Sequence, residues 1–350
     1  MTILDILRRA IEIDAADIFL IAGLPVTFKC GGHQERNPGD FLRPGDIRML
    51  VESVYELSRR DRSNLDKGLD DDFSFAVPHL GRFRVNVFRQ RGSVAAVIRV
   101  IRFGLPDPVQ LGIPEAVLSL AENKKGLVLI TGSAGTGKST TLACMIDRIN
   151  KSRDCHIITM EDPIEYIHRH DKAIVTQREI SIDTPSYLDS LRSALRESPD
   201  VILLGEMRDY ETISAAITAA ETGVLLLSTL HTSSAANTIN RILDVFPANQ
   251  QKQVKIQLAQ ILKGVVCQQL VPSTDGGQLP VFEIMKSTVA IQNMIREDKL
   301  HQLESAMQAG AADGMCTMDG SLLKLYREGK ITRDTALVSC VNYENMAKRL

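Results

Sequence analysis

Strict alternation of polar and apolar side chains marks residues 82–87 as a strand with one buried face. Residues 94–101 predict its neighbouring strand, and residues 48–59 predict a helix. The first hundred residues are therefore expected to form a small α+β domain.

The rest of the chain alternates apolar runs with amphipathic stretches. In segment 103–108 two prolines separated by one residue exclude regular structure and mark a linker. The regular alternation beyond it predicts an α/β domain with a mainly parallel sheet. The expected strands cover residues 127–131, 155–160, 201–204 and 224–229. The expected helices cover residues 114–122, 138–149, 185–196, 211–222 and 250–270, followed by short amphipathic helices. This pattern predicts an N-terminal domain over 1–102, a linker over 103–113, an α/β domain over 114–287 and a C-terminal helical region over 288–350.

A complete phosphate-binding motif follows the first expected strand of the α/β domain and opens a helix. It comprises Gly132, Ser133, Ala134, Gly135, Thr136, Gly137, Lys138, Ser139 and Thr140. In that context backbone N–H groups and the helix N-terminus surround phosphate oxygens. Lys138 would reach the β- and γ-phosphates and the Ser139 hydroxyl would ligate Mg²⁺. Because the sequence has no N-K-x-D element for reading guanine, we expect ATP.

Acidic residues stand at two expected strand ends, where they would face the phosphates. Glu161 is the candidate that orients the attacking water, and Glu206 the candidate on the metal side. Gly205 stands where an ordinary Walker B element has aspartate. The neighbouring Asp162 and Glu165 have a simpler interpretation, which we prefer for Glu165: they cap or solvate a turn. His231, after residues 224–229, is a candidate γ-phosphate sensor, although a lone histidine there is more often a packing or hydrogen-bonding residue.

The charge balance and the cysteines indicate what kind of partner and compartment to expect. Lys plus Arg (41) nearly balances Asp plus Glu (43), so nothing in the charge suggests a nucleic-acid partner. Six scattered cysteines without a C-x-x-C pair are typical of reduced core residues in the cytosol.

The N-terminus has no continuous apolar core of a signal peptide. Its apolar residues instead mark one face of a helix; they are Ile3, Leu4, Leu7, Ala10 and Ile11. No run approaches the ~18 apolar residues of a membrane span. We therefore expect a cytoplasmic protein without direct membrane insertion.

Several longer motifs resemble one known family. They are GSAGTGKST at 132–140, TMEDPIEYIH at 159–168, LRSALRESPDVILLGEMRD at 191–209, AAETG at 219–223 and TLHTSSAANTINRILDVFP at 229–247. Shorter matches outside the core lie at 16–18, 72–75, 82–86 and 290–297. Together they cover nearly the whole chain and resemble the secretion-type ATPases, specifically the type IV pilus retraction ATPases of the PilT type.

The resemblance implies a PAS-like N-terminal domain, a RecA-like P-loop ATPase domain and a hexameric ring docked on an inner-membrane pilus platform protein. It also implies ATP bound between the domains, with Arg82 and Arg84 reaching the γ-phosphate. Alternation places both arginines on one strand face, and guanidinium suits phosphate. Solvation of a sheet face is the simpler interpretation for arginines on an isolated strand. Arg99 is a weaker third candidate.

Two absences favour retraction over assembly. In the family that the chain resembles, assembly ATPases usually carry a tetracysteine zinc element, whereas segment 268–283 contains no cysteine. They also tend to have an extra N-terminal domain, which we do not expect here. Val224, Phe19 and Gln292 depart from the family pattern, and Val224 is expected to remove a polar group near the active-site or inter-domain region.

We therefore expect an Mg²⁺-dependent ATPase that drives pilus retraction and twitching motility. Two alternatives remain: a related secretion or DNA-uptake motor, and an accessory ATP-binding pilus subunit with low turnover.

Overall fold

The computed structural model describes residues 1–31, 33–101 and 104–350. These form two compact units, Met1–Gly104 and Leu105–Leu350. The expected boundary between the first domain and the linker falls on residues 102 and 103, outside the described residues.

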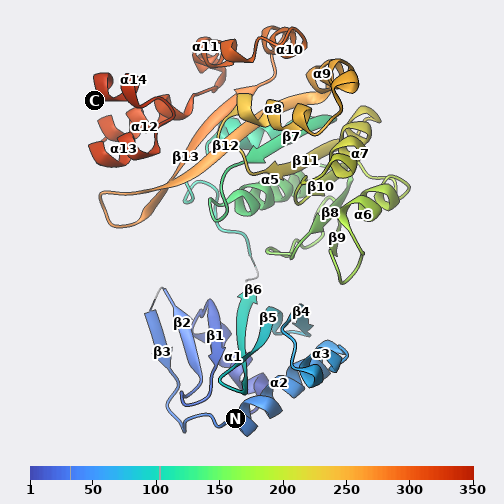
Figure 1. Cartoon of the computed structure of the whole chain (residues 1–350), viewed down its shortest axis with the longest axis vertical. Coiled ribbons are helices and arrows are strands. Elements are labelled where there is room, and N and C mark those ends of the chain that lie inside the picture. The colour runs from blue at the N-terminus through green and yellow to red at the C-terminus, as the bar shows by residue number, and fades with distance from the viewer. Residues whose placement is uncertain (32, 102–103) are drawn as a thin grey trace. The chain divides into compact units, whose positions relative to one another are not determined.

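Unit 1 is an antiparallel sheet with helices against one face (blue to cyan in Figure 1). Its strands, in the order β3-β2-β1-β6-β5-β4, are β1 (Asp17–Leu20), β2 (Thr27–Cys30), β3 (His33–Arg36), β4 (Asp71–Val77), β5 (Gly81–Gln90) and β6 (Ser93–Ile101). Its helices are α1 (Ile3–Glu12), α2 (Pro44–Ser58) and α3 (Ser63–Lys67).

The alternation in β5 sorts its side chains onto the two faces of this sheet. Phe83 and Val85 are buried in one core with residues of α1 and α2, whereas Arg82 and Arg84 belong to the opposite face. The predicted half-buried strand is thus confirmed. The amphipathic first helix is also confirmed, but its buried face is shifted: Ile6 is buried, while Ile11 is 38% exposed.

Unit 2 is built on a seven-stranded sheet in the order β13-β12-β7-β11-β10-β8-β9 (Figure 1). All neighbouring pairs are parallel except β12 with β13. The strands are β7 (Gly126–Thr131), β8 (His156–Glu161), β9 (Ile174–Glu179), β10 (Val201–Leu204), β11 (Leu225–Leu230), β12 (Leu262–Pro272) and β13 (Gln278–Lys286). The predicted α/β class with a mainly parallel sheet is confirmed.

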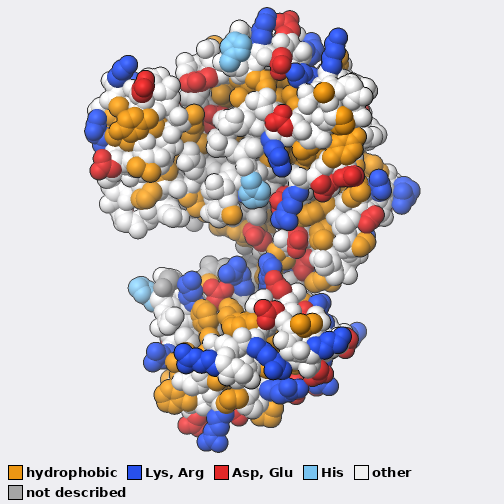
Figure 2. Space-filling model, in the orientation of Figure 1, with side chains coloured by type: hydrophobic (Ala, Val, Ile, Leu, Met, Phe, Trp, Pro, Cys, Tyr) orange, Lys and Arg blue, Asp and Glu red, His pale blue; other side chains and the backbone are white. Residues whose placement is uncertain are grey.

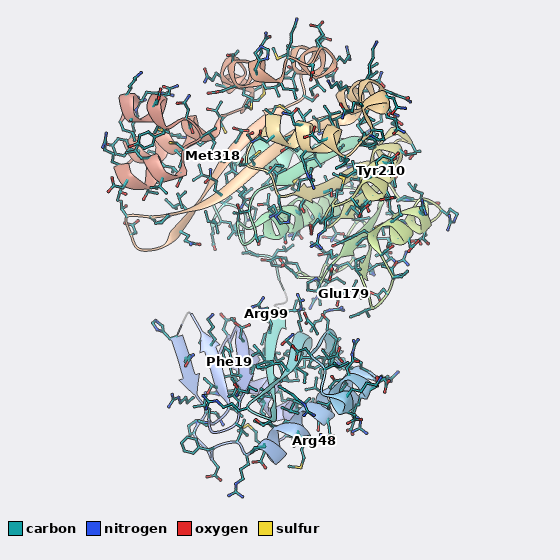
Figure 3. The ribbon with its side chains drawn as sticks, viewed as in Figure 1. Phe19, Arg48, Arg99, Glu179, Tyr210 and Met318 are labelled. Atoms are coloured by element: carbon teal, nitrogen blue, oxygen red, sulfur yellow. The ribbon has the colours of Figure 1, made fainter. Side chains whose placement is uncertain are left out.

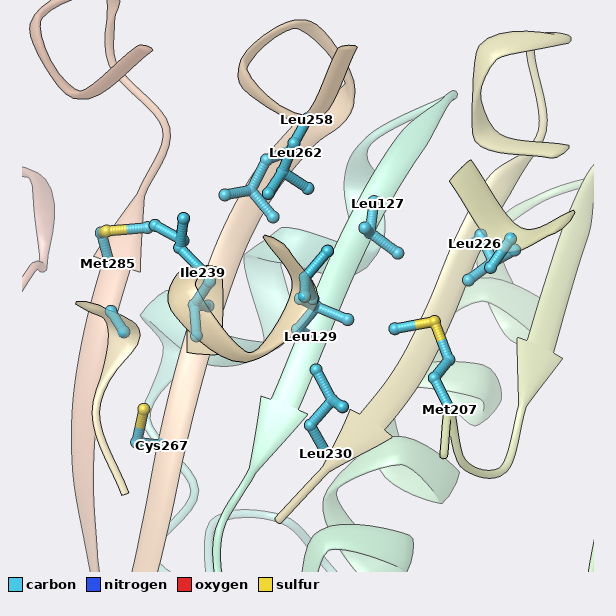
Figure 4. Close-up of a cluster of buried hydrophobic side chains, with 14 of the residues drawn as sticks. Leu127, Leu129, Met207, Leu226, Leu230, Ile239, Leu258, Leu262, Cys267 and Met285 are labelled. Carbon is cyan, nitrogen blue, oxygen red and sulfur yellow. The ribbon is translucent and has the colours of Figure 1, made fainter. Parts of the chain in front are cut away.

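Helices cover both faces of this sheet. They are α4 (Glu115–Leu118), the 3₁₀ turn η1 (Ser119–Glu122), α5 (Lys138–Ser152), α6 (Tyr187–Ala194), α7 (Tyr210–Glu221), α8 (Ala235–Asp244) and α9 (Ala248–Ile261). Leu127 and Leu129 of β7 pack in the core shared with α6 to α9, shown in Figure 4. Val128 and Ile130 point to the other core, with η1 and α5. Because β7 is buried on both faces, it is apolar throughout.

The predicted helix over 250–270 is wrong in its second half. Helix α9 ends at Ile261, and the chain continues directly as β12, which pairs with β7 and β13. A short, fully buried apolar run such as 265–267 looks the same in a buried helix and in a central strand. A glycine inside such a run, as at Gly264, is the better sequence indication of a strand in close contact with a neighbour. In the structure a Cβ at Gly264 would lie 2.8 Å from a methyl of Leu120. Strands β9 and β13 were not predicted.

The C-terminal region is helical, as predicted. It contains α10 (Val289–Arg296), η2 (Leu300–Gln302), α11 (Leu303–Ala309), η3 (Ala311–Asp313), α12 (Met318–Arg327), α13 (Arg333–Ser339) and α14 (Tyr343–Arg349). Figure 2 shows acidic and basic side chains interspersed over the visible surface, in keeping with the balanced composition. Within the described ranges, no helix has the length and apolar character needed to cross a membrane.

Candidate nucleotide site

The phosphate loop runs from the end of β7 into α5, as the motif predicts. Gly135 and Gly137 have φ angles of 76° and 86°, in the left-handed region that favours glycine. At Gly132, with φ at 142°, a Cβ would lie 2.2 Å from the carbonyl oxygen of Gln268. The loop therefore depends on glycine both for its turns and for its close packing against β12.

Lys138 is buried and turns back over the loop. Its Nζ donates to the carbonyl oxygens of Gly132 and Ser133, both at 2.8 Å. Burial lowers the pKa of Lys138, while the negative charges of Glu206 and Glu165 oppose this shift. Phosphate oxygens also accept hydrogen bonds, and unlike the two carbonyl oxygens they carry negative charge. Phosphate can therefore replace these carbonyls as the partner of the Lys138 ammonium group.

Three other predicted residues stand at the same edge of the sheet. Glu161 is the last residue of β8, while Glu206 follows β10 and His231 follows β11. Because these strands are parallel neighbours of one another and of β7, their carboxyl ends share the edge that carries the phosphate loop. The structure thus brings together Lys138, Glu161, Glu206 and His231.

Glu206 lies next to Arg208 and His231. Arg208 Nε donates to Glu206 Oε1, and His231 Nε2 lies 3.5 Å from the same oxygen. Burial raises the pKa of Glu206, but the hydrogen bond and charge of Arg208 outweigh it, aided by His231 and Lys138, and the net shift is downward. Glu206 is therefore an ionised carboxylate, as a ligand on the metal side must be.

Glu161 has the opposite electrostatic character. Burial raises its pKa to about 7, although Thr159 and Gln177 donate hydrogen bonds that favour the ionised form. The Thr159 hydroxyl lies 2.6 Å from Glu161 Oε1 and the Gln177 amide 3.2 Å from the same atom. A carboxylate with a pKa near the working pH is suited to orient water or accept a proton.

Of the candidate arginines in the N-terminal unit, Arg82 and Arg84 lie on β5 and Arg99 lies on β6. Arg84 donates to Asp72 Oδ1 at 2.9 Å, and the third candidate, Arg99, donates to Asp17 Oδ1 at 3.0 Å. The role of Arg82 and Arg84 at the γ-phosphate stays a prediction.

Three residues that support the site were missed from sequence. Gln268 of β12 accepts a hydrogen bond from Thr141 of α5 at 2.8 Å and lies against the phosphate loop. Gln177 holds Glu161, and the Tyr166 hydroxyl lies 2.9 Å from that of Thr140. An amide inside an apolar run, as at Gln268, is the one sequence signal that could have indicated such a role, since buried polar groups need partners.

The expected effect of Val224 on the active-site region needs correction. Val224 precedes β11 and accepts a hydrogen bond from Gly126 N at 3.0 Å, at the amino ends of β11 and β7. The phosphate loop and the acidic residues lie at the opposite ends of these strands, so this departure does not touch them.

Comparison with known proteins agrees with this geometry. The family described as Type II/IV secretion system protein matches residues 70–312. The chain is 44% identical to the type IV pilus retraction ATPase PilT of Pseudomonas aeruginosa, covering 96% of this chain and 97% of that protein. It is 40% identical to the type IV pilus ATPase PilU of the same organism, covering 95% and 87%.

Solved structures give the same result. The pilus retraction motor PilT with bound ADP has a TM-score of 0.92 at 47% identity, covering 99% of both chains. The ATPase DotB of Legionella pneumophila has a TM-score of 0.79 at 27% identity, covering 97% and 95%.

The phosphate loop after β7, the carboxylates at the neighbouring strand ends and these similarities together define a secretion-type ATPase. The chain belongs to the Type II/IV secretion system protein family, and within it to the pilus retraction ATPases.

Proposed function

We propose that this chain hydrolyses ATP as a subunit of a homohexameric motor that powers type IV pilus retraction. One relative over nearly the full length is a type IV pilus retraction ATPase, and a similar retraction motor was solved with ADP. In this proposal the ring works in the cytoplasm and docks on a platform protein in the inner membrane.

The site fits the phosphates of a nucleotide. The glycine-rich turn presents backbone N–H groups, α5 contributes its N-terminus, and Lys138 supplies a buried positive charge. Residues 132–140 therefore hold the phosphates of ATP, with Lys138 exchanging its loop carbonyls for β- and γ-phosphate oxygens.

The residues at the site also fit Mg²⁺. The donors that Mg²⁺ prefers are oxygens, and this edge offers the Ser139 hydroxyl and the ionised Glu206 carboxylate. Ser139 and Glu206, the latter through water, would hold the ion, which would neutralise charge on the phosphates.

The protein groups divide the remaining work. Glu161 orients the attacking water, because its carboxylate is held on one side by Thr159 and Gln177. His231, next to Glu206, senses whether the γ-phosphate is present. In the same proposal, Arg82 and Arg84 provide positive charge for the γ-phosphate.

The observation that carries this proposal is the meeting of Lys138, Glu161, Glu206 and His231 at one edge of a parallel sheet. The test measures Mg²⁺-dependent ATP turnover of the wild type, Lys138→Ala and Glu206→Ala. The oligomeric state of each protein is measured by size-exclusion chromatography. Lys151→Ala is the control, because Lys151 belongs to the same helix but is exposed and pairs with Asp147. We expect a ring-sized oligomer, with turnover only in the wild type and the control. A monomer or an inactive wild type would favour an accessory ATP-binding role.

A further inference from the structure

The side chain of Gln177, on β9, connects three parts of the site. Its Nε2 donates to Glu161 Oε1 at 3.2 Å and to the carbonyl oxygen of Tyr166 at 2.9 Å. Its Oε1 accepts from the backbone N–H of His168 at 2.8 Å. Because the carbonyl can only accept and the N–H can only donate, these partners allow a single orientation of the amide.

The register of the sheet brings Gln177 to Glu161. Strands β8 and β9 are parallel, with Thr159 opposite Gln177 and Glu161 opposite Glu179. Residues two apart share a face, so Thr159, Glu161 and Gln177 lie on one side of the sheet. The hydroxyl of the fully buried Thr159 donates to the same oxygen of Glu161, which is thus held by donors from two strands.

The turn after β8 is fastened to the phosphate-loop helix. The Tyr166 hydroxyl lies 2.9 Å from the hydroxyl of Thr140, in the first turn of α5. At the other end of the turn, the buried carboxylate of Glu179, labelled in Figure 3, accepts from Ile164 N at 3.1 Å. Gln177 therefore contacts Glu161 and also the segment that meets the helix bearing the nucleotide.

The electrostatic surroundings show why this contact matters. Burial and the nearby charge of Glu165 raise the pKa of Glu161, whereas hydrogen bonds from Thr159, Gln177 and the Glu165 backbone lower it. Tyr187 of α6 is a further titratable group near Glu161, and burial raises its pKa, so it is neutral. Removal of the Gln177 donor should therefore raise the pKa of Glu161 further and favour its protonated form.

We infer that Gln177 is a positioning residue for Glu161, and that it couples the orientation of this carboxylate to the phosphate-loop helix through Tyr166. The inference rests on the proposed role of Glu161 in ATP hydrolysis. Gln177 itself touches neither nucleotide nor water in this account.

The test compares pH profiles of kcat and KM for ATP. Gln177→Met keeps the length of the side chain but cannot donate, and we expect kcat to fall on the order of 10- to 100-fold. The acid limb of the kcat profile should move to higher pH, while KM changes little because the phosphate loop is intact. Gln177→Glu, which retains an acceptor for His168 N, should move the acid limb upward as well.

Thr176→Val is the matched control. Thr176 neighbours Gln177 on β9, but its hydroxyl lies 3.0 Å from His156 Nε2 and is not bonded to Glu161. It should keep the wild-type kcat and acid limb. The inference is overturned if both Gln177 variants keep the wild-type acid limb, or if Thr176→Val shifts it equally; the ATPase proposal survives either result. A wild type without ATP turnover overturns both.

Discussion

Gly205 stands where an ordinary Walker B element has aspartate, and its surroundings explain the exchange. A Cβ at this position would lie 2.8 Å from the Tyr187 hydroxyl and 3.0 Å from the Met160 carbonyl oxygen. The next residue, Glu206, is the one proposed for the metal side, and Arg208 and His231 favour its ionised form. The sequence showed that Gly205 was unusual, but only the close packing of Tyr187 on α6 and Met160 on β8 around it explains the glycine.

Gly205→Ala should lower the free energy of unfolding by about 1–3 kcal/mol, the usual cost of overpacking. Combining it with Tyr187→Phe, which removes the nearest atom, should recover part of the loss. Urea unfolding measures both, and Gly277→Ala is the control because nothing lies within 4 Å of a Cβ there. Equal stability of Gly205→Ala and Gly277→Ala would contradict the packing argument.

The raised pKa of Glu161 gives a second prediction at this scale. In the proposed role the ionised form orients water, so activity should be present above the pKa of about 7 and be lost as the pH falls through it. The pH profile of kcat/KM, which reports the nucleotide-free enzyme, should have an acid limb near pH 7, and Glu161→Gln should reduce kcat across the whole range. A profile that stays flat from pH 6 to 8 would exclude this role.

At the scale of elements, prediction succeeded where local pattern and tertiary setting agree. Strand β7 and helix α5 follow from an apolar run and the phosphate motif, and the structure has them almost as predicted. The helix over 250–270 failed because β12 owes its strand form to pairing with β7 and β13, which no local window contains. The contact of Gln268 with Thr141 was missed for the same reason, since it joins β12 to α5, which lie far apart in the sequence. Gln177 contacts only the preceding strand β8 and the turn after it, and it was missed because β9 itself was not predicted.

Strand β13 carries a buried carboxylate that anchors two helices. Glu283 Oε1 accepts from Ala235 N at 2.8 Å, and Oε2 accepts from Met318 N at 3.3 Å, at the N-termini of α8 and α12. Burial raises the pKa of Glu283, although both of these N–H groups oppose the shift. A carboxylate oxygen near helix N-termini satisfies donors that would otherwise be buried without partners.

Glu283→Ala should therefore destabilise unit 2 by about 2 kcal/mol, because it leaves buried N–H groups unpaired. Thermal unfolding should show a lower midpoint, whereas the exposed Glu304→Ala on α11 should change it little. Since α8 begins just after His231, ATP turnover should fall as well. An unchanged midpoint would show that these helices do not depend on Glu283.

At the scale of the whole molecule, the two units serve one proposed cycle. Unit 2 holds the residues proposed to bind and hydrolyse ATP, and Arg82 and Arg84 of unit 1, on the face of β5 away from its core, stay candidates for the γ-phosphate. The departures Val224 and Phe19 lie outside the phosphate loop and its acidic partners; Gln292 lies on α10. Hydrolysis should therefore be preserved, and any special property of this chain should concern coupling.

The central claim is that ATP hydrolysis by this chain drives pilus retraction. The most direct measurement is the retraction of individual labelled pili in cells lacking the gene, complemented with wild type, Lys138→Ala or Lys151→Ala at equal protein levels. We expect retraction with the wild type and Lys151→Ala, and pili that extend but do not retract with Lys138→Ala. Normal retraction in the deletion strain, or with Lys138→Ala as the sole copy, would contradict it.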